Sequence, residues 1–124
     1  MANEKKVLLI EDDTFLSSLI KARLEKEGFG VAQAFDGEEG VQLLKKEKPD
    51  LIILDLIMPK VSGFETMEHL NINVDLNQIP LVVLSNLAQD SDIQKAKSLG
   101  AKEFFVKIRT SIDDVVAKVK ELLG

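Results

Sequence analysis

The chain of 124 residues contains no cysteine and a single histidine, His69. Without cysteine it can form no disulfide, no thiolate nucleophile and no zinc–thiolate site. No apolar run is long enough for a signal peptide or a membrane span, and the N-terminus has only a short one before Glu11. We therefore expect a cytoplasmic protein without a membrane segment. His69 lies off the apolar line of a predicted helix, so we expect it in solvent.

The chain also lacks a broad excess of positive charge. Its net charge is −5, with 30% charged and 45% hydrophobic residues. This composition is typical of a folded globular protein, and it argues against non-specific binding of nucleic acid. The length suits one domain with one sizeable core, and no low-complexity tract, charge run or repeat marks a second one. We expect a single domain over residues 1–124.

Short apolar runs alternate with amphipathic segments along the chain. Residues 7–10, 31–35, 51–55, 81–85 and 103–107 are expected as strands. Apolar side chains at helical spacing follow each of them, which predicts five helices. This alternation implies a parallel sheet with helices on both faces.

Three of the five predicted strands are apolar at successive positions, with the sequences "VLLI", "LIIL" and "LVVL". Strands that are buried on both faces have this pattern and belong in the middle of a sheet. The segments "VAQAF" and "EFFVK" contain polar residues and suit the edges. The flavodoxin-like strand order 2-1-3-4-5 places all five accordingly. We therefore predict a three-layer α/β fold, a (βα)5 doubly wound parallel sheet.

Capping residues mark the expected starts of several helices. Asp13 or Thr14 is expected to cap the first helix, and Asp36 the second. Ser91, with Gln94 three residues later, fits a capping box for the fourth helix.

Polar side chains stand at the carboxyl ends of four predicted strands. In an open α/β sheet, ligands bind beyond these ends, at the switch point between the first and third strands. The residues at these ends are Glu11 and Asp12, Asp55, Ser85 and Lys107. We expect three carboxylates, one hydroxyl and one amine to converge there, with Asp55 at the exposed lip of its strand.

This set of groups suits a metal ion and a phosphate. Neighbouring carboxylates resist ionisation unless a cation offsets their charge. Oxygen ligands without histidine or cysteine suit a hard ion, and few protein ligands favour Mg²⁺ over Ca²⁺. Lys107 and Ser85 are able to contact phosphate oxygens. An aspartate beside Mg²⁺ is a known nucleophile for phosphoryl transfer, which gives an aspartyl phosphate.

Taken singly, each of these residues has an ordinary structural interpretation. An acidic residue after a strand is more often a helix cap, and a serine before a loop more often serves a turn. A terminal lysine is typical of a solvated strand edge. The occurrence of all of them at the ends of four strands favours one shared site.

The motifs "LLIEDD", "LIILDLIMPKVSGFE", "LVVLSN" and "GAKEFFVK" resemble the receiver domain of two-component response regulators, over residues 6–123. The resemblance implies that Asp55 accepts a phosphoryl group from a histidine kinase or a histidine phosphotransfer protein. It also implies that Mg²⁺ is bound by Asp12, Asp55 and the backbone carbonyl of Ile57, with Glu11 acting mainly through water. A protein of this family is a signalling switch rather than an enzyme.

The same resemblance implies a conformational switch. Lys107 would contact the phosphoryl group or, before transfer, Asp55, and Ser85 would supply a hydroxyl that moves toward the phosphate. Phe104 occupies the aromatic switch position and would turn inward. A downstream protein would then bind the face formed by the fourth helix, fifth strand and fifth helix, and no direct contact with nucleic acid is expected.

Three features depart from the family pattern. One is that Ile57 and Leu87 flank the site where many members of the family carry polar side chains that help to position water. Lys107 is followed by Ile108, where the family usually has a proline after a cis bond. A cis bond without proline costs about 2.5–4 kcal/mol, so we predict a trans peptide and a reshaped loop. Asn86 stands where the family usually has a small residue, and its bulk narrows access to the phosphate.

Two alternative functions would require other features of the sequence. A phosphohydrolase of the haloacid dehalogenase type would carry a second aspartate two residues after the nucleophile, where this chain has Ile57. A pseudo-receiver would keep the fold as a protein-interaction module without phosphotransfer. The chemically competent residues at all five site positions argue against it.

Overall fold

The computed structural model describes residues 4–87 and 89–124 of the chain. Its five strands form one parallel sheet in the order β2-β1-β3-β4-β5, which confirms the predicted topology. The strands are β1 (Lys6–Ile10), β2 (Gly30–Ala34), β3 (Leu51–Leu54), β4 (Leu81–Ser85) and β5 (Ala101–Val106). The two strands with polar residues lie at the edges, as their composition predicted.

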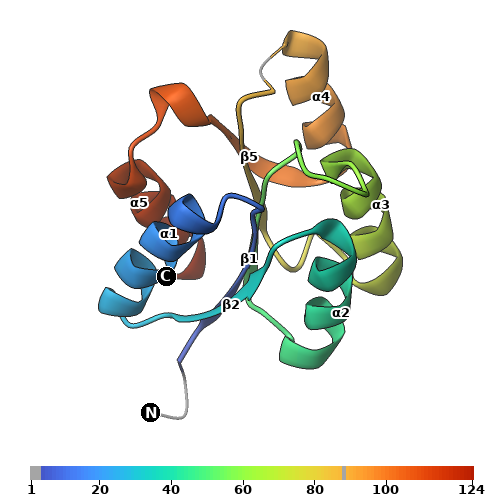
Figure 1. Cartoon of the computed structure of the whole chain (residues 1–124). Helices are drawn as coiled ribbons and strands as arrows, with labels where there is room; N and C mark the ends of the chain where they lie inside the picture. Colours follow the sequence, from blue (N-terminus) through green and yellow to red (C-terminus); the bar gives the residue numbers. More distant parts are fainter. Residues whose placement is uncertain (1–3, 88) are drawn as a thin grey trace.

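Helices cover both faces of the sheet. In the described part of the chain they are α1 (Thr14–Lys26), α2 (Gly37–Glu47), α3 (Gly63–Asn73), α4 (Asp90–Ser98), α5 (Ile112–Leu123) and the short 3₁₀ helix η1 (Lys107–Arg109). The helices α1 and α5 lie on one side of the sheet, and α2, α3 and α4 lie on the other (Figure 1). The predicted three-layer, doubly wound fold is therefore confirmed. No helix within residues 4–87 and 89–124 combines the length and the apolar character needed to cross a bilayer.

The central strands contribute side chains to two separate apolar cores, one on each face of the sheet. Successive side chains of a strand point to opposite faces, so Ile52 packs in the core under α2, α3 and α4, while Ile53 packs in the core under α1 and α5. Both side chains are almost fully buried. Burial on both faces is the physical reason why the central strands are apolar at every position.

Most of the predicted helix caps are present. The Asp13 carboxylate accepts hydrogen bonds from the backbone N–H groups of Phe15 and Leu16, both at 3.1 Å, so Asp13 rather than Thr14 caps α1. Asp36 caps α2 in the same way. These bonds satisfy backbone donors that a helix leaves unpaired in its first turn.

The predicted capping box at Ser91 is wrong. The helix α4 begins at Asp90 and its N-cap is Gln89, which makes no side-chain cap hydrogen bond. The carbonyl oxygen of Gln89 accepts the backbone N–H groups of Asp92 and Ile93, at 2.9 and 3.1 Å. Ser91 therefore lies within the first turn of α4 and not at the N-cap position, so its hydroxyl does not cap the helix.

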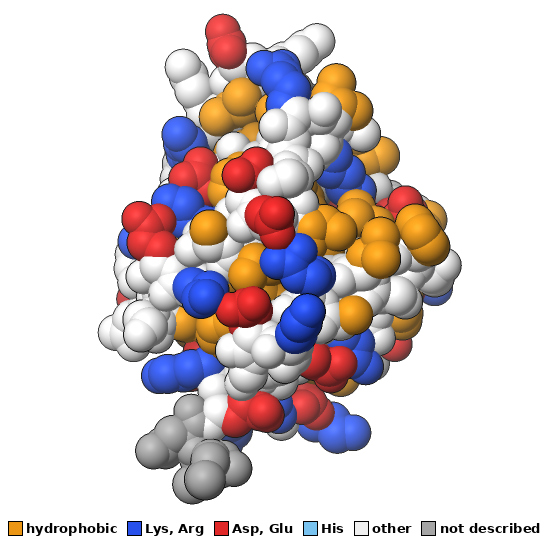
Figure 2. Space-filling view, turned by 90° about the vertical axis from the view of Figure 1, so that its left-hand side faces the viewer, with side chains coloured by type: hydrophobic (Ala, Val, Ile, Leu, Met, Phe, Trp, Pro, Cys, Tyr) orange, Lys and Arg blue, Asp and Glu red, His pale blue; other side chains and the backbone are white. Residues whose placement is uncertain are grey.

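The surface of the α1 and α5 layer carries charges of both signs, with hydrophobic side chains gathered along one edge of the view (Figure 2). Two exposed ion pairs join the two helices or their ends: Arg23 with Asp113 at 2.7 Å, and Lys120 with Glu27 at 2.8 Å. Exposed pairs of this kind contribute about 0–1 kcal/mol. The buried core beneath the helices therefore holds this layer in place.

Candidate functional site

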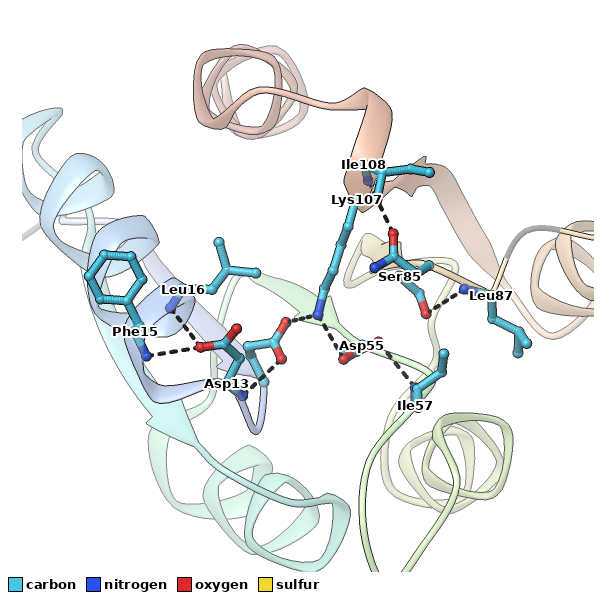
Figure 3. Close-up of polar contacts among 11 residues, drawn as sticks. Asp13, Phe15, Leu16, Asp55, Ile57, Ser85, Leu87, Lys107 and Ile108 are labelled. Carbon is cyan, nitrogen blue, oxygen red and sulfur yellow. Dashed lines mark hydrogen bonds and ion pairs between the residues drawn. The ribbon is translucent and has the colours of Figure 1, made fainter.

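Parallel pairing brings the carboxyl ends of the strands to one edge of the sheet. Ile10 of β1 pairs with Leu54 of β3, so the residues that follow them, Glu11 and Asp55, are neighbours. The backbone N–H of Asp55 also donates to the carbonyl oxygen of Ile10 at 3.0 Å. Because β5 lies beside β4, Lys107 enters the same region from the other side (Figure 3).

Three carboxylates gather there as the strand ends predicted. Glu11, Asp12 and Asp55 each offer an oxygen, and these oxygens all lie within 4.8 Å of one another. Glu11 and Asp55 are buried, whereas Asp12 is exposed. The geometry therefore combines two acids inside the protein with a third at the solvent boundary.

The prediction that Asp55 lies at an exposed lip is wrong, because only 3% of its surface is accessible. Its burial is tolerated because both carboxylate oxygens have partners. Lys107 Nζ lies 2.9 Å from Oδ2, and the backbone N–H of Ile57 donates to Oδ1 at 3.1 Å. A fixed cation and a backbone donor thus replace the water that an exposed carboxylate would have.

Lys107 bridges two acids. Its contact with Asp55 was expected, and its contact with Glu11 is one that sequence reasoning missed. Its Nζ lies 2.7 Å from Glu11 Oε1 as well as 2.9 Å from Asp55 Oδ2. Burial acts to lower the pKa of Lys107, but the hydrogen bonds to Glu11 and Asp55 outweigh it and hold the pKa above its ordinary value. The ammonium group therefore stays charged and offsets part of the negative charge of the site.

Burial raises the pKa of Glu11 to about 7. The hydrogen bond from Lys107 and the one from the backbone N–H of Asp13, at 3.0 Å, act in the opposite direction, and the nearby charge of Asp55 adds a smaller upward effect. Resistance to ionisation was expected of these carboxylates from their mutual repulsion. In the structure, loss of water contributes more than repulsion.

An open cavity of about 220 Å³ lies in front of the acids and is lined by Asp12, Asp55, Ile57, Asn86 and Lys107. Ile57 is exposed at 53% and projects no polar group into it. The Asp55 carboxylate is thus buried by its neighbours yet reachable from this cavity.

The two residues expected to act as a switch, Ser85 and Phe104, lie outside the lining of this cavity. Ser85 is fully buried, and its Oγ accepts the backbone N–H of Leu87 at 3.2 Å. Phe104 is half-buried and packs against the core under α2, α3 and α4, while Phe105 packs on the opposite face, as strand alternation predicted. Neither Ser85 nor Phe104 is among the described residues that line the cavity.

The turn after β5 carries the second feature that sequence reasoning missed. The described residues contain no cis peptide bond, which confirms the predicted trans bond before Ile108. The backbone N–H of Ile108 donates to Asn86 Oδ1 at 3.1 Å. The sequence signal was present, because isoleucine keeps an N–H that proline lacks, but nothing local in the chain indicates which acceptor it meets.

The donor set fits a hard divalent cation. It consists of oxygen atoms only, it opens onto a cavity with room for water, and one ammonium group does not balance three carboxylates. Asp12, Asp55 and the backbone carbonyl of Ile57 are the candidate ligands. Such a site, with a lysine beside it, is able to stabilise a phosphoryl group on Asp55.

Comparison with known proteins points in one direction. A family model described as the response regulator receiver domain matches residues 7–120. The chain is 30% identical over 102 residues to protein PilH of Pseudomonas aeruginosa, an alignment that covers 82% of this chain and 84% of that protein. A receiver domain protein described as CheY-like, from Methanospirillum hungatei, superposes with a TM-score of 0.90 at 25% identity, covering 98% of this chain and 94% of that one.

A further relative is a longer protein. The chain is 39% identical over 115 residues to the transcriptional regulatory protein YcbL of Bacillus subtilis. The alignment covers 91% of this chain and 48% of YcbL. The chain spans about half the length of the first curated relatives that it matches.

Proposed function

Because the chain belongs to the response regulator receiver domain family, we propose that Asp55 is its phosphoacceptor. Receiver domains are signalling modules that interact with histidine kinases and downstream effectors, and they are not enzymes in the usual sense. The observation that carries the proposal is the position of Asp55. Its carboxylate lies between Lys107 and the backbone N–H of Ile57 and faces an open cavity.

The proposed reaction is an in-line transfer to the Asp55 carboxylate. A carboxylate oxygen forms a bond to the phosphorus atom of a phosphohistidine, and the phosphorus–nitrogen bond breaks. The bonding electron pair leaves with the imidazole, which takes up a proton from solvent. Before transfer, Lys107 Nζ lies 2.9 Å from Asp55 Oδ2. After transfer, it would form an ion pair with a phosphoryl oxygen, where the negative charge then lies.

Mg²⁺ is the proposed cofactor, as is typical of the family. Asp12, Asp55 and the backbone carbonyl of Ile57 would hold it, and Glu11 would act mainly through water. When bound, the ion neutralises negative charge on the carboxylates and on the phosphoryl oxygens.

We further propose that the new charge shifts the domain to a second conformation. Ser85 Oγ would exchange its bond with the Leu87 N–H for one with the phosphoryl group, and Phe104 would turn inward. The face of α4, β5 and α5 would change as a result and bind a downstream protein. The phosphoryl donor would be a histidine kinase or a phosphotransfer protein.

Acetyl phosphate with Mg²⁺, followed by intact mass measurement, tests the proposal. The wild-type protein is expected to gain the mass of one phosphoryl group, and Asp55→Asn is expected to gain none. Asp13→Asn is the matched control, because Asp13 is an exposed neighbour and asparagine still caps a helix. It is expected to gain the same mass as the wild type.

Two results would contradict the assignment. No mass gain in the wild type would favour the pseudo-receiver alternative, a binding module without phosphotransfer. The same gain in Asp55→Asn would place the phosphoryl group elsewhere. Removal of Mg²⁺ with a chelator is expected to abolish most of the gain.

A further inference from the structure

The residue that follows Ser85 has a side chain with two chemically different ends. Asn86 lies directly beyond β4, and its Oδ1 accepts the backbone N–H of Ile108 at 3.1 Å. The strands β4 and β5 are neighbours, and Ser85 pairs with Val106 at their ends. The bond therefore ties the loop after β4 to the η1 turn after β5 (Figure 3).

The chemistry of this bond decides how the carboxamide is turned. A backbone N–H needs an acceptor, so the oxygen end of Asn86 faces Ile108 and the Nδ2 end faces away from it. Asn86 also lines the cavity together with Asp55 and Lys107. No partner of Nδ2 is found among residues 4–87 and 89–124. The side chain thus brings an amide donor to the cavity that the Asp55 carboxylate faces.

Ser85, the expected hydroxyl donor, does not line the cavity in this structure. It is fully buried, and its Oγ is engaged with the backbone N–H of Leu87. Of the described residues in the loop after β4, the one that lines the cavity is Asn86. A phosphoryl group arriving on Asp55 would therefore meet the Asn86 carboxamide before Ser85 had moved.

We propose that Asn86 is a phosphoryl-contacting residue, whose Nδ2 donates a hydrogen bond to an oxygen of the phosphoryl group on Asp55 while its Oδ1 holds the Ile108 N–H. The inference rests on the proposed phosphorylation of Asp55. A phosphoryl group presents three acceptor oxygens and a charge of about −1.5 to −2, and hydrogen bonds to such a group are strong. Through Asn86 the group is linked to the η1 turn, which starts at Lys107.

Asn86→Asp is the sharpest variant, because it keeps the size and one acceptor oxygen for Ile108 but replaces the amide donor with a second oxygen. We expect phosphorylation by acetyl phosphate to slow by at least about tenfold, the effect of losing one hydrogen bond to a charged group. Asn77→Asp adds the same charge at an exposed position between α3 and β4 and is expected to behave as the wild type.

A direct observation on the wild-type protein avoids any effect of substitution on folding. The side-chain amide signals of Asn86 in a ¹⁵N spectrum are identified by their absence in Asn86→Ala. On addition of beryllofluoride, a phosphoryl mimic that binds aspartate, with Mg²⁺, these signals are expected to shift downfield. Asn86→Ala is expected to bind beryllofluoride about tenfold more weakly than the wild type.

The outcomes separate this inference from the proposal on which it rests. If the wild type is phosphorylated on Asp55 while the Asn86 amide signals stay unchanged and Asn86→Asp reacts at the wild-type rate, the role of Asn86 is refuted and Asp55 remains the acceptor. If the wild type gains no phosphoryl mass, both are refuted together.

Discussion

At the scale of single residues, the site is organised around the neutralisation of buried acids. Glu11 and Asp55 are both almost inaccessible to solvent, and one ammonium group, that of Lys107, serves both. A lysine that bridges two carboxylates leaves the site negative unless one acid is protonated or a cation binds. The negative charge of the site therefore favours binding of a cation even without a phosphoryl group.

The raised pKa of Glu11 leads to a prediction about stability and pH. The pKa is about 7 in the folded protein against an ordinary value of 4.5, so the stabilisation from protonated Glu11 is complete below pH 4.5 and is lost as the pH rises through 7. Glu11→Gln removes this loss. The wild type therefore loses stability between pH 4 and pH 8, whereas Glu11→Gln has no such loss. In the absence of Mg²⁺, we expect the difference in unfolding free energy, Glu11→Gln minus wild type, to be more positive at pH 8 than at pH 4, by at most about 3 kcal/mol.

Urea unfolding of both proteins at the two pH values, in chelator, measures this difference. Glu25→Gln is the control, because Glu25 is exposed, and its effect is expected to be the same at both pH values. An effect of Glu11→Gln that does not change with pH would contradict the raised pKa.

The site residues show what the sequence was able to predict at this scale. The residue types and the sheet edge on which they meet followed from strand ends and parallel pairing. The resemblance to the receiver family also implied the contact between Lys107 and Asp55, which the structure has. The contacts of Lys107 with Glu11 and of Ile108 with Asn86 did not follow, because these residues are far apart in the sequence. That one lysine reaches two neighbouring acids depends on the exact positions of the side chains, which a residue pattern does not contain.

At the scale of helices and strands, local patterns were sufficient for most boundaries. The apolar runs predicted which strands are central, since burial on both faces requires them. Ser111 and Asp114 form a capping box at the start of α5, with both reciprocal bonds present. The failure at Ser91 has a local cause: the same spacing of serine and glutamine occurs inside the first turn of α4, two residues after the N-cap position, which Gln89 occupies.

The missing cap of α4 gives a prediction at this scale. Gln89 is the N-cap, with extended backbone angles of φ −69° and ψ 149°, but it makes no side-chain cap bond. Gln89→Ser is expected to raise the free energy of unfolding by about 0.5–1 kcal/mol, because a serine hydroxyl accepts a first-turn N–H. Urea unfolding measures the gain.

Gln94→Ser supplies the control for the change of residue type alone. Gln94 is exposed inside the same helix, where serine is a slightly poorer helix former than glutamine. A gain of equal size at both positions, or none at position 89, would show that capping is not the cause.

At the scale of the whole molecule, one sheet joins two apolar cores. Ile52 and Ile53 are adjacent in β3 and belong to different cores. Because both cores depend on the same strand, loss of packing in one core is expected to destabilise the other. A domain built in this way is expected to unfold in one cooperative step.

Truncation on either face tests this expectation. Ile52→Ala and Ile53→Ala are each expected to lower the free energy of unfolding by about 3 kcal/mol, because both side chains are buried. Each variant is expected to show one urea transition by circular dichroism. Ile72→Ala, at a position that is 80% exposed, is expected to change stability by less than about 0.5 kcal/mol.

A two-step urea transition in either buried variant would contradict cooperative unfolding, since one core would then melt while the other stayed folded. Equal destabilisation by Ile72→Ala would show that burial is not what sets the effect.

The sequence by itself determined the alternation of strands and helices, the order of the strands and the set of residues at the carboxyl edge. These depend on periodicity and burial, which are properties of short segments. Only the tertiary structure decided that Asp55 is buried, that Lys107 bridges Glu11 and Asp55, and that Asn86 rather than Ser85 lines the cavity. These depend on where side chains from distant strands meet, and that is settled by the packing of the whole sheet.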